Sequence, residues 1–223
     1  MLIEVIAVTL DDVLDAGRYG ADRIELCSSM DADGLTPSIG LIRAASTASN
    51  IPVNVMVRNH NESFIYSDTD KAVMLDEISF IRETKASGIV IGMLNENNAV
   101  DETFLKAVND VAGHLDIVFH KAFDQIDDKD AALKTLGKYP KVKTILTAGG
   151  PGSAGDNFNL LSDLQKSADT YGITIMPGGG LKADAVSHYR DTFTALHFGT
   201  GVRENQSFAG RLSREQLKQL KEL

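Results

Sequence analysis

The strongest constraint on the fold is an alternation, repeated eight times, between a short apolar run and a longer segment with helical periodicity. The apolar runs span residues 2–7, 24–27, 53–57, 89–94, 115–119, 142–146, 173–176 and 195–198. The helical segments span residues 11–19, 39–49, 68–85, 102–111, 130–138, 158–171, 183–189 and 213–223. Short apolar runs that alternate with amphipathic segments predict a parallel sheet whose strands are joined by crossover helices.

Eight such units in 223 residues, about 28 residues each, predict one α/β domain over residues 1–223 that closes into a (β/α)₈ TIM barrel. An open doubly wound sheet is the alternative, although no G-x-G-x-x-G follows the first apolar run. Four glycines are expected to end helices in the left-handed conformation: Gly20, Gly88, Gly113 and Gly172. Thr36, just before Pro37, is expected to cap the helix that follows.

Composition excludes several classes of protein. The formal net charge is −9, and no run of Lys or Arg offers a footprint for nucleic acid. No apolar stretch approaches the roughly 18 residues that span a bilayer, so we expect no membrane role. Cys27 is the one cysteine, which rules out an internal disulfide, and the start of the chain lacks an export signal. We therefore expect a cytoplasmic location.

Alternate residues of a barrel strand face the lumen, and here that inward set is unusually polar. We expect Phe119 and Phe198 to face outward instead. The expected inward set is Glu4, Ile6, Arg23, Glu25, Cys27, Asn54, Met56, Arg58, His120, Thr147, Thr174, Met176 and His197. Burying unpaired charges costs several kcal/mol each, so Glu4, Glu25, Arg23 and Arg58 are predicted to form an ion-pair network.

Four of these residues stand near the carboxyl ends of strands, where barrel enzymes place their reacting groups. Glu25, Arg58, His120 and His197 are the candidate catalytic residues. A carboxylate, two imidazoles and a guanidinium around one mouth suit general acid–base chemistry on an anionic substrate. The alternative is that the network is purely structural.

Glycine-rich turns follow the last three strands, at residues 149–152, 178–180 and 199–201. In many barrels such turns hold a phosphate, because glycine lets the anion approach backbone N–H groups closely. The predicted anion site comprises Gly178, Gly179, Gly180, Gly199 and Arg203. The alternative is that these glycines only form tight turns.

Metal ligands are sparse. Cys27 and Met30 form a C-x-x-M element, and Cys27 is the candidate ligand for Cu(I), which prefers sulfur. The alternative is that Cys27 is a small buried hydrophobe. The five histidines lie in different units without a zinc spacing.

Collinear motifs run the length of the chain, and through them it strongly resembles the CutC family. They are GADRIELC at residues 20–27, GLTPS at 34–38, VMVR at 55–58, FIYSD at 64–68, FHKAFD at 119–124, ILT at 145–147 and MPGGG at 176–180. The resemblance implies a barrel fold, a cytoplasmic location, frequently a homodimer, and a role in copper homeostasis with Cu(I) as the bound ion. Many relatives have cysteine in place of Ile6 and His-Cys-Ser-Ala-Arg in place of residues 197–201, so the second thiol is missing here.

Two hypotheses follow. The resemblance implies a cytoplasmic protein that binds or delivers copper, with Cys27 as its soft ligand. The residues themselves favour a barrel enzyme of the lyase, isomerase or hydrolase type that acts on a small anionic or phosphorylated metabolite. There Glu25 and His120 would serve as acid and base, and Arg58 would hold the anion. A barrel without catalytic activity, whose surface binds partner proteins, is a further alternative.

Overall fold

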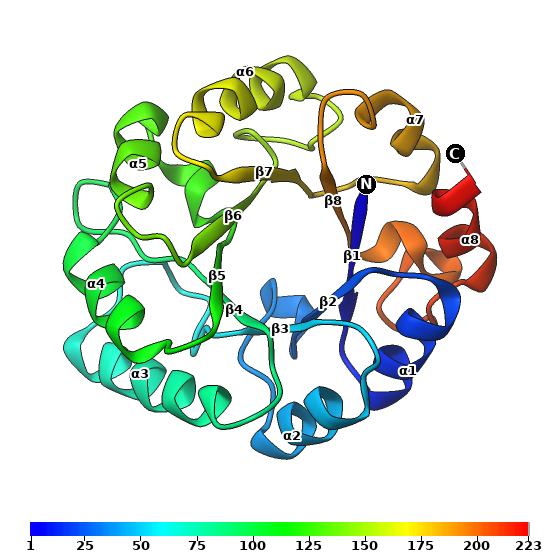
Figure 1. The fold of residues 1–223 in the computed structure, drawn as a ribbon, viewed down its shortest axis with the longest axis horizontal. Coiled ribbons are helices and arrows are strands. Elements are labelled where there is room, and N and C mark those ends of the chain that lie inside the picture. Colours follow the sequence, from blue (N-terminus) through cyan, green and yellow to red (C-terminus); the bar gives the residue numbers. More distant parts are fainter. Residues whose placement is uncertain (223) are drawn as a thin grey trace.

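The computed structural model describes residues 1–222 and shows eight parallel strands ringed by helices, which confirms the (β/α)₈ barrel (Figure 1). The strands are β1 (Leu2–Ala7), β2 (Arg23–Leu26), β3 (Val53–Met56), β4 (Gly88–Ile91), β5 (Asp116–Phe119), β6 (Val142–Thr147), β7 (Thr174–Pro177) and β8 (Ala195–Phe198). The hydrogen-bonded order is β7-β6-β5-β4-β3-β2-β1-β8. Strands β7 and β8 lie side by side and complete the ring.

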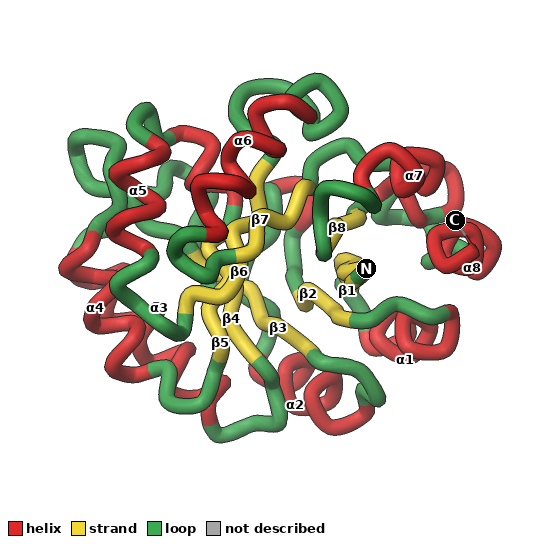
Figure 2. Tube along the Cα trace, turned by 45° about the horizontal axis from the view of Figure 1, so that its top comes forward, coloured by secondary structure: helices red, strands yellow, loops and turns green. Residues whose placement is uncertain are grey.

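The helices cover the outside of the ring, as Figure 2 also shows. They are α1 (Leu10–Tyr19), α2 (Ile39–Ala48), α3 (Asp68–Arg82), α4 (Glu102–Val111), α5 (Lys129–Leu136), α6 (Phe158–Asp169), α7 (Val186–Tyr189) and α8 (Arg214–Glu222). Leu223, which the sequence places in the last helix, lies outside the described residues. No helix in residues 1–222 is long and apolar enough to cross a membrane.

The ends of the helices agree with the sequence in part. Gly20, Gly113 and Gly172 have positive φ angles, as expected of left-handed caps. Gly88 does not: it begins β4, where a Cβ would lie only 2.7 Å from both Asn54 Oδ1 and Asp116 O. That glycine is needed for close approach inside the barrel rather than for a cap.

The cap of α2 is also not the predicted one. Ser38 accepts from the backbone N–H of Leu41, whereas the hydroxyl of Thr36 accepts from the N–H of Arg58 at 2.9 Å. Thr36 N–H in turn donates to the Arg58 carbonyl at 2.9 Å. Thr36 therefore ties the loop after β2 to the end of β3, and so helps to position Arg58.

Most of the apolar core lies between the sheet and the helices, and it contains Phe119 and Phe198, as predicted. A smaller apolar cluster fills the lumen: Ile6, Cys27, Met56, Val90, Val118, Leu146, Met176 and Ala195. Four members of this cluster, Ile6, Cys27, Met56 and Leu146, also line the cavity described below. Thr147 was predicted to face inward, but Leu146 takes that place, and the Thr147 hydroxyl donates to Asp124 in the loop after β5.

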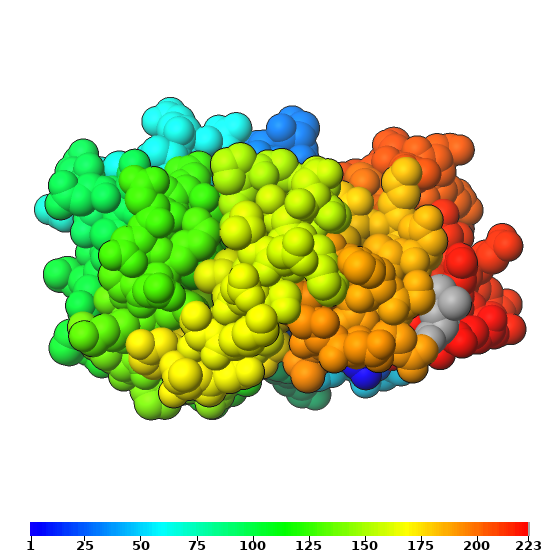
Figure 3. Space-filling view, turned by 90° about the horizontal axis from the view of Figure 1, so that it is seen from above, coloured from blue at the N-terminus to red at the C-terminus, as the bar shows by residue number. Residues whose placement is uncertain are grey.

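The mouth of the barrel is built by loops that follow the strands. In the side view of Figure 3, the loops after β2 (blue), β3 (cyan) and β8 (orange) project beyond the body of the barrel on one side. They come from the carboxyl ends of their strands, the end at which barrels place their binding sites.

Candidate active site

A cavity of about 680 Å³ opens at the carboxyl ends of the strands. This volume is that of a site for a small organic ligand. The structure brings the four predicted catalytic residues together there, since Glu25, Arg58, His120 and His197 all line it. They stand on two different walls, which differ in how their polar atoms are satisfied.

The wall formed by β8, β1 and β2 carries a chain of charges, which we call the Glu4 chain: Arg23, Glu4, His197 and Glu25. Arg23 Nε donates to Glu4 Oε2, and Glu4 Oε1 lies 2.8 Å from His197 Nδ1. His197 Nε2 lies 3.2 Å from Glu25 Oε2. Strand register causes this arrangement, because Glu4 is opposite Arg23 on one side and His197 on the other. The predicted ion-pair network is confirmed for Glu4, Glu25 and Arg23.

Within the Glu4 chain, the surroundings shift the pKa values of the two carboxyls in opposite directions. Burial raises the pKa of Glu25 to about 7, with the neighbouring Glu4 adding to the effect. Burial also acts against the charge of Glu4, but Arg23 and His197 outweigh it and lower the pKa of Glu4. Burial opposes a charged His197, yet Glu25 and Glu4 together raise the pKa of the imidazole. The charges of Arg23 and His197 thus favour the anionic form of Glu4, whereas burial favours the protonated form of Glu25.

Glu4, Glu25 and His197 also offer one ligand atom each within 4.8 Å of one another, as a metal ion would require. However, Arg23 already neutralises Glu4, and each nitrogen of His197 already faces a carboxylate. The donor set thus fits proton transfer better than it fits a cation.

The second wall, formed by the ends of β3 to β5, carries Arg58, which is buried but has no carboxylate partner within residues 1–222. Its Nη1 donates to the carbonyls of Ala32 at 3.2 Å and Asp33 at 3.4 Å, and its Nε has no partner. The guanidinium lies 4.8 Å from the ring centre of Phe64. The prediction that Arg58 joins the ion-pair network is wrong; His197 takes that role.

His120 stands next to Arg58 on this wall, at the start of the short 3₁₀ turn Lys121–Gln125. Its Nδ1 accepts from the backbone N–H of Ala122 at 3.1 Å, and its buried Nε2 has no partner in the described chain. Burial, with the positive charges of Arg58 and Lys121, lowers the pKa of His120 to about 3. Gly92 leaves room for the ring, because a Cβ there would collide with His120 Nδ1.

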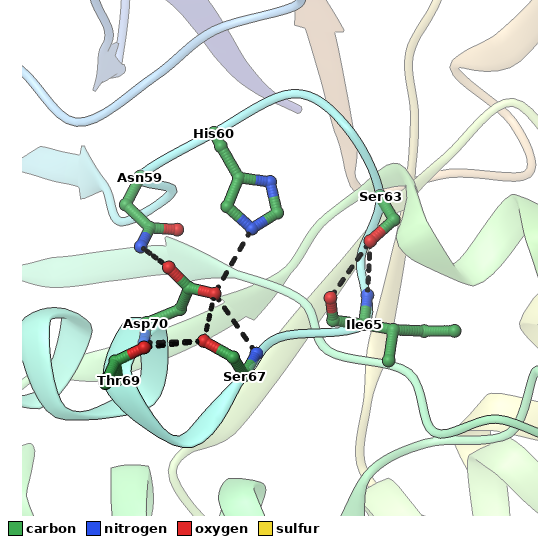
Figure 4. A network of polar contacts seen from close by, with 7 residues as sticks. All are labelled: Asn59, His60, Ser63, Ile65, Ser67, Thr69 and Asp70. Atoms are coloured by element: carbon green, nitrogen blue, oxygen red, sulfur yellow. Dashed lines mark hydrogen bonds and ion pairs between the residues drawn. The ribbon is translucent and has the colours of Figure 1, made fainter.

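The loop after β3 holds Phe64 between the two donors, 5.0 Å from the ring of His120. Figure 4 shows how Asp70, in the first turn of α3, ties both ends of this loop. Asp70 accepts from Asn59 Nδ2 at 2.9 Å and from Ser67 N at 3.1 Å. Ser67 and Asp70 form a capping box, so the loop is anchored by the helix it precedes.

The glycine turns lie where the anion site was predicted. Gly179, Gly180 and Gly199 line the cavity, together with Gly150 and Gly152. Gly178 does not line it; a Cβ there would lie 2.5 Å from Leu146 Cδ1 and 3.1 Å from His197 Cβ, so this glycine permits packing.

Arg203 does not reach the cavity. It is 1% exposed, and its guanidinium pairs with Asp12 at 2.8 Å and donates to the Ile6 carbonyl at 2.9 Å. It also packs against Phe208, 5.1 Å from the ring centre, and Phe208 lines the cavity. Arg203 therefore holds the loop after β8 rather than an anion.

Two lysines that sequence reasoning missed line the cavity instead. The position of a Cβ on Gly179 lies 3.6 Å from Lys121 Nζ, so this amine stands over the glycine turn. Lys182 follows the same turn. Their positions next to predicted site residues could have indicated them, because Lys121 comes directly after His120 and Lys182 comes two residues after Gly180.

Cys27 lines the cavity and is 1% exposed. Burial, with Glu25 and Glu4 adding, raises the pKa of its thiol well above the ordinary value. Cys27 Sγ and Met30 Sδ lie 3.5 and 3.6 Å from the position of a Cβ on Gly34. The structure thus brings the two sulfurs of the C-x-x-M element to one place.

Comparisons with known proteins agree with this architecture. The sequence model of the CutC family matches residues 1–204. The family protein CutC of Mesorhizobium japonicum is 37% identical over 85% of this chain and 72% of its own, and that of Salmonella enteritidis is 35% identical over 95% and 81%. A crystal structure of CutC from Streptococcus agalactiae, described as a copper homeostasis protein, matches with a TM-score of 0.83 and 28% identity, over 89% of this chain and 98% of that one.

Proposed function

The chain belongs to the CutC family, and we propose that it is a barrel enzyme of the lyase, isomerase or hydrolase type that acts on a small phosphorylated metabolite. The S. agalactiae relative is described as a copper homeostasis protein, which names a cellular role but no reaction. The chemistry of the cavity supports the enzyme proposal through three features: an unpaired cation, a glycine turn beside an amine, and a carboxylic acid held by a histidine.

Arg58 is the observation that carries the proposal. A buried guanidinium costs several kcal/mol of desolvation unless an anion compensates it. Within residues 1–222 only the carbonyls of Ala32 and Asp33 accept hydrogen bonds from Arg58. A phosphate in the cavity would supply the missing charge and would match the fork of guanidinium donors.

Lys121, Gly179 and Gly180 support the same ligand from the side of β7. Gly179 and Gly180 have φ angles of +102° and +82°, a conformation that suits glycine and that lets an anion approach the backbone. Lys121 Nζ stands over this turn. Glu25 lines the same cavity and would move a proton to or from the bound metabolite.

Calorimetric titration with inorganic phosphate and with glycerol 3-phosphate tests the proposal. We expect both to bind, and Arg58→Met to weaken binding by about 30-fold, since a hydrogen bond to a charged group contributes about 2 kcal/mol. Arg190→Met, at an exposed position outside the cavity, is the matched control. Absence of binding to the wild-type protein at millimolar ligand, or equal binding by Arg58→Met, would refute the proposal.

Cu(I) binding is a second candidate, which the convergence of Cys27 Sγ and Met30 Sδ favours. Both side chains line the cavity, so an ion could reach them. The donors fit Cu(I) in kind, a thiolate and a thioether, although Ile6 supplies no further ligand.

Anaerobic competition for Cu(I) against a chromogenic chelator tests this candidate. We expect Cys27→Ser to abolish tight binding and Met30→Leu to weaken it, whereas Met74→Leu, in the outer core, should leave it unchanged. If Cys27→Ser competes as well as the wild-type protein, the sulfur pair is not a copper site.

A further inference from the structure

His120 and Glu25 face one cavity from opposite walls, and each keeps a buried polar atom without a partner in the described chain, Nε2 and Oε1. We propose that His120 donates its Nε2–H to the carbonyl oxygen of the substrate while Glu25 removes a proton from the adjacent carbon. The substrate would then be a phosphorylated aldehyde or ketone with a C–H bond beside the carbonyl. This inference rests on the proposed function and narrows its reaction class.

The backbone fixes which nitrogen of His120 carries hydrogen. Nδ1 accepts the N–H of Ala122 at 3.1 Å, so its lone pair is engaged and it holds no proton. A neutral imidazole in that position has its hydrogen on Nε2. Protonating Nδ1 would set two N–H groups against each other, so the geometry keeps the ring neutral, in accord with its lowered pKa.

The surroundings of His120 suit a donor to a developing negative charge. Arg58 and Lys121 place positive charge near the ring, and Phe64 packs against it and shields it from water. A preorganised donor in a site with little water stabilises an oxyanion strongly, because it need not reorient during the reaction. His120 is thus equipped to stabilise an enolate and not to take up a proton.

Glu25 is equipped for the complementary task. His197 Nε2 orients it through Oε2, whereas Oε1 is buried and has no partner in the described chain. The Glu4 chain behind His197 keeps the imidazole in place, since Glu4 binds its other nitrogen. A carboxylate fixed through one oxygen can accept a proton from carbon with the other.

The step balances without a further reactant. The C–H bond breaks as its proton moves to Glu25, its electron pair forms a C=C bond, and the π pair of the carbonyl becomes a lone pair on the oxygen. His120 donates to that oxygen and keeps its own proton. Return of the proton from Glu25 to the same carbon restores the substrate. If the carbon that loses the proton also carries a hydroxyl, the intermediate is an enediolate; return of the proton to the former carbonyl carbon, with the hydroxyl proton moving to the other oxygen, then gives the isomer.

Binding of 2-phosphoglycolohydroxamate, a planar enediolate mimic, tests the inference against glycerol 3-phosphate, which carries a phosphate but no such group. We expect the hydroxamate to bind the wild-type protein about 100-fold more tightly. His120→Asn, which keeps an acceptor near Nδ1 but loses the donor at Nε2, should lose this preference and bind glycerol 3-phosphate normally. His120→Gln, whose amide N–H₂ can reach the place of Nε2, should restore part of it.

Each outcome separates the two proposals. If both ligands bind the wild-type protein equally, or if His120→Asn keeps the preference, the enolate mechanism is overturned and the phosphate site stands. If neither ligand binds, the proposed function falls and this inference with it. Nitrogen-15 NMR of the His120 ring adds a ligand-free check: a proton on Nε2 alone at pH 5 to 8 supports the inference, and protonation of Nδ1 within that range overturns it.

Discussion

The two walls of the cavity differ in how they satisfy their buried polar groups. On the wall of β8, β1 and β2, the Glu4 chain joins Arg23, Glu4, His197 and Glu25 through ion pairs. On the second wall, formed by the ends of β3 to β5, Arg58 has no carboxylate partner and His120 Nε2 has no partner at all in the described residues. One wall balances its own charges, and the other presents free donors.

The difference arises from where the side chains leave the sheet. Glu4, Arg23 and His197 lie within neighbouring strands, whose register places them opposite one another. Arg58 and His120 come just after β3 and β5, beyond the residues that the strand register pairs side by side. The wall of the Glu4 chain therefore positions Glu25 through its own ion pairs. On the other wall, the polar groups of Arg58 and His120 are left for a ligand to bind.

Breaking the Glu4 chain should have the largest effect on stability. Glu4→Ala leaves the half-buried Arg23 and the buried His197 without their shared anion, and removing one partner of a buried ion pair costs about 3–5 kcal/mol. Urea unfolding at pH 7 measures the loss. The exposed pair of Glu102 with Lys138 provides the control, since Glu102→Ala should change stability little. A loss under 1 kcal/mol in Glu4→Ala would show that the chain is not a structural unit.

The pH dependence of stability should show the next largest effect. The pKa of Glu25 is about 7 in the folded protein against 4.5 ordinarily, so between these values the folded state holds a proton that the unfolded state has lost. Stability therefore falls as pH rises through this window, by up to about 3 kcal/mol. The raised pKa of His197 acts in the same direction, because its favourable charge is lost as pH rises through the folded value.

Glu25→Gln removes the first contribution, since the amide does not titrate, and weakens the second, since only Glu4 then favours a charged His197. Between pH 5 and pH 8 we expect the unfolding free energy of the variant to decline clearly less than that of the wild-type protein. Parallel pH curves for the two proteins would contradict the raised pKa of Glu25.

The sequence predicts the fold and the convergence of Glu25, Arg58, His120 and His197 because both follow from strand periodicity. Eight apolar runs determine the number of strands, and a period of two determines which residues face the lumen. Both rules depend on residue type and spacing alone. They apply best inside the strands, and the Glu4 chain is the part of the site most fully predicted.

The same rules fail where a loop competes for a side chain. Thr147 ends β6 and binds Asp124 instead of facing the lumen. Arg203 pairs with Asp12, 191 residues away on α1. The neutrality of His120 depends on the N–H of Ala122, which periodicity does not reveal. Contacts between distant loops have no local sequence signal. The sequence therefore identifies Arg58 and His120 as candidate site residues, but it does not indicate that Arg58 lacks a carboxylate partner or that His120 is neutral.

Arg58→Met, on the second wall, should have the smallest effect on stability. Its comparison with Glu4→Ala is the most direct test of the difference between the two walls. Arg58→Met removes two hydrogen bonds to main-chain carbonyls but breaks no ion pair, and a methionine can keep the contact with Phe64. Because the desolvation of this guanidinium is not repaid by a carboxylate, the unfolding free energy without ligand should change by less than about 1 kcal/mol. At the same concentration, phosphate should stabilise the wild-type protein more than the variant, since the stabilisation grows with the affinity of the folded state for the ligand. A loss as large as that of Glu4→Ala would place Arg58 in the scaffold and leave the cavity without a free cation on that wall.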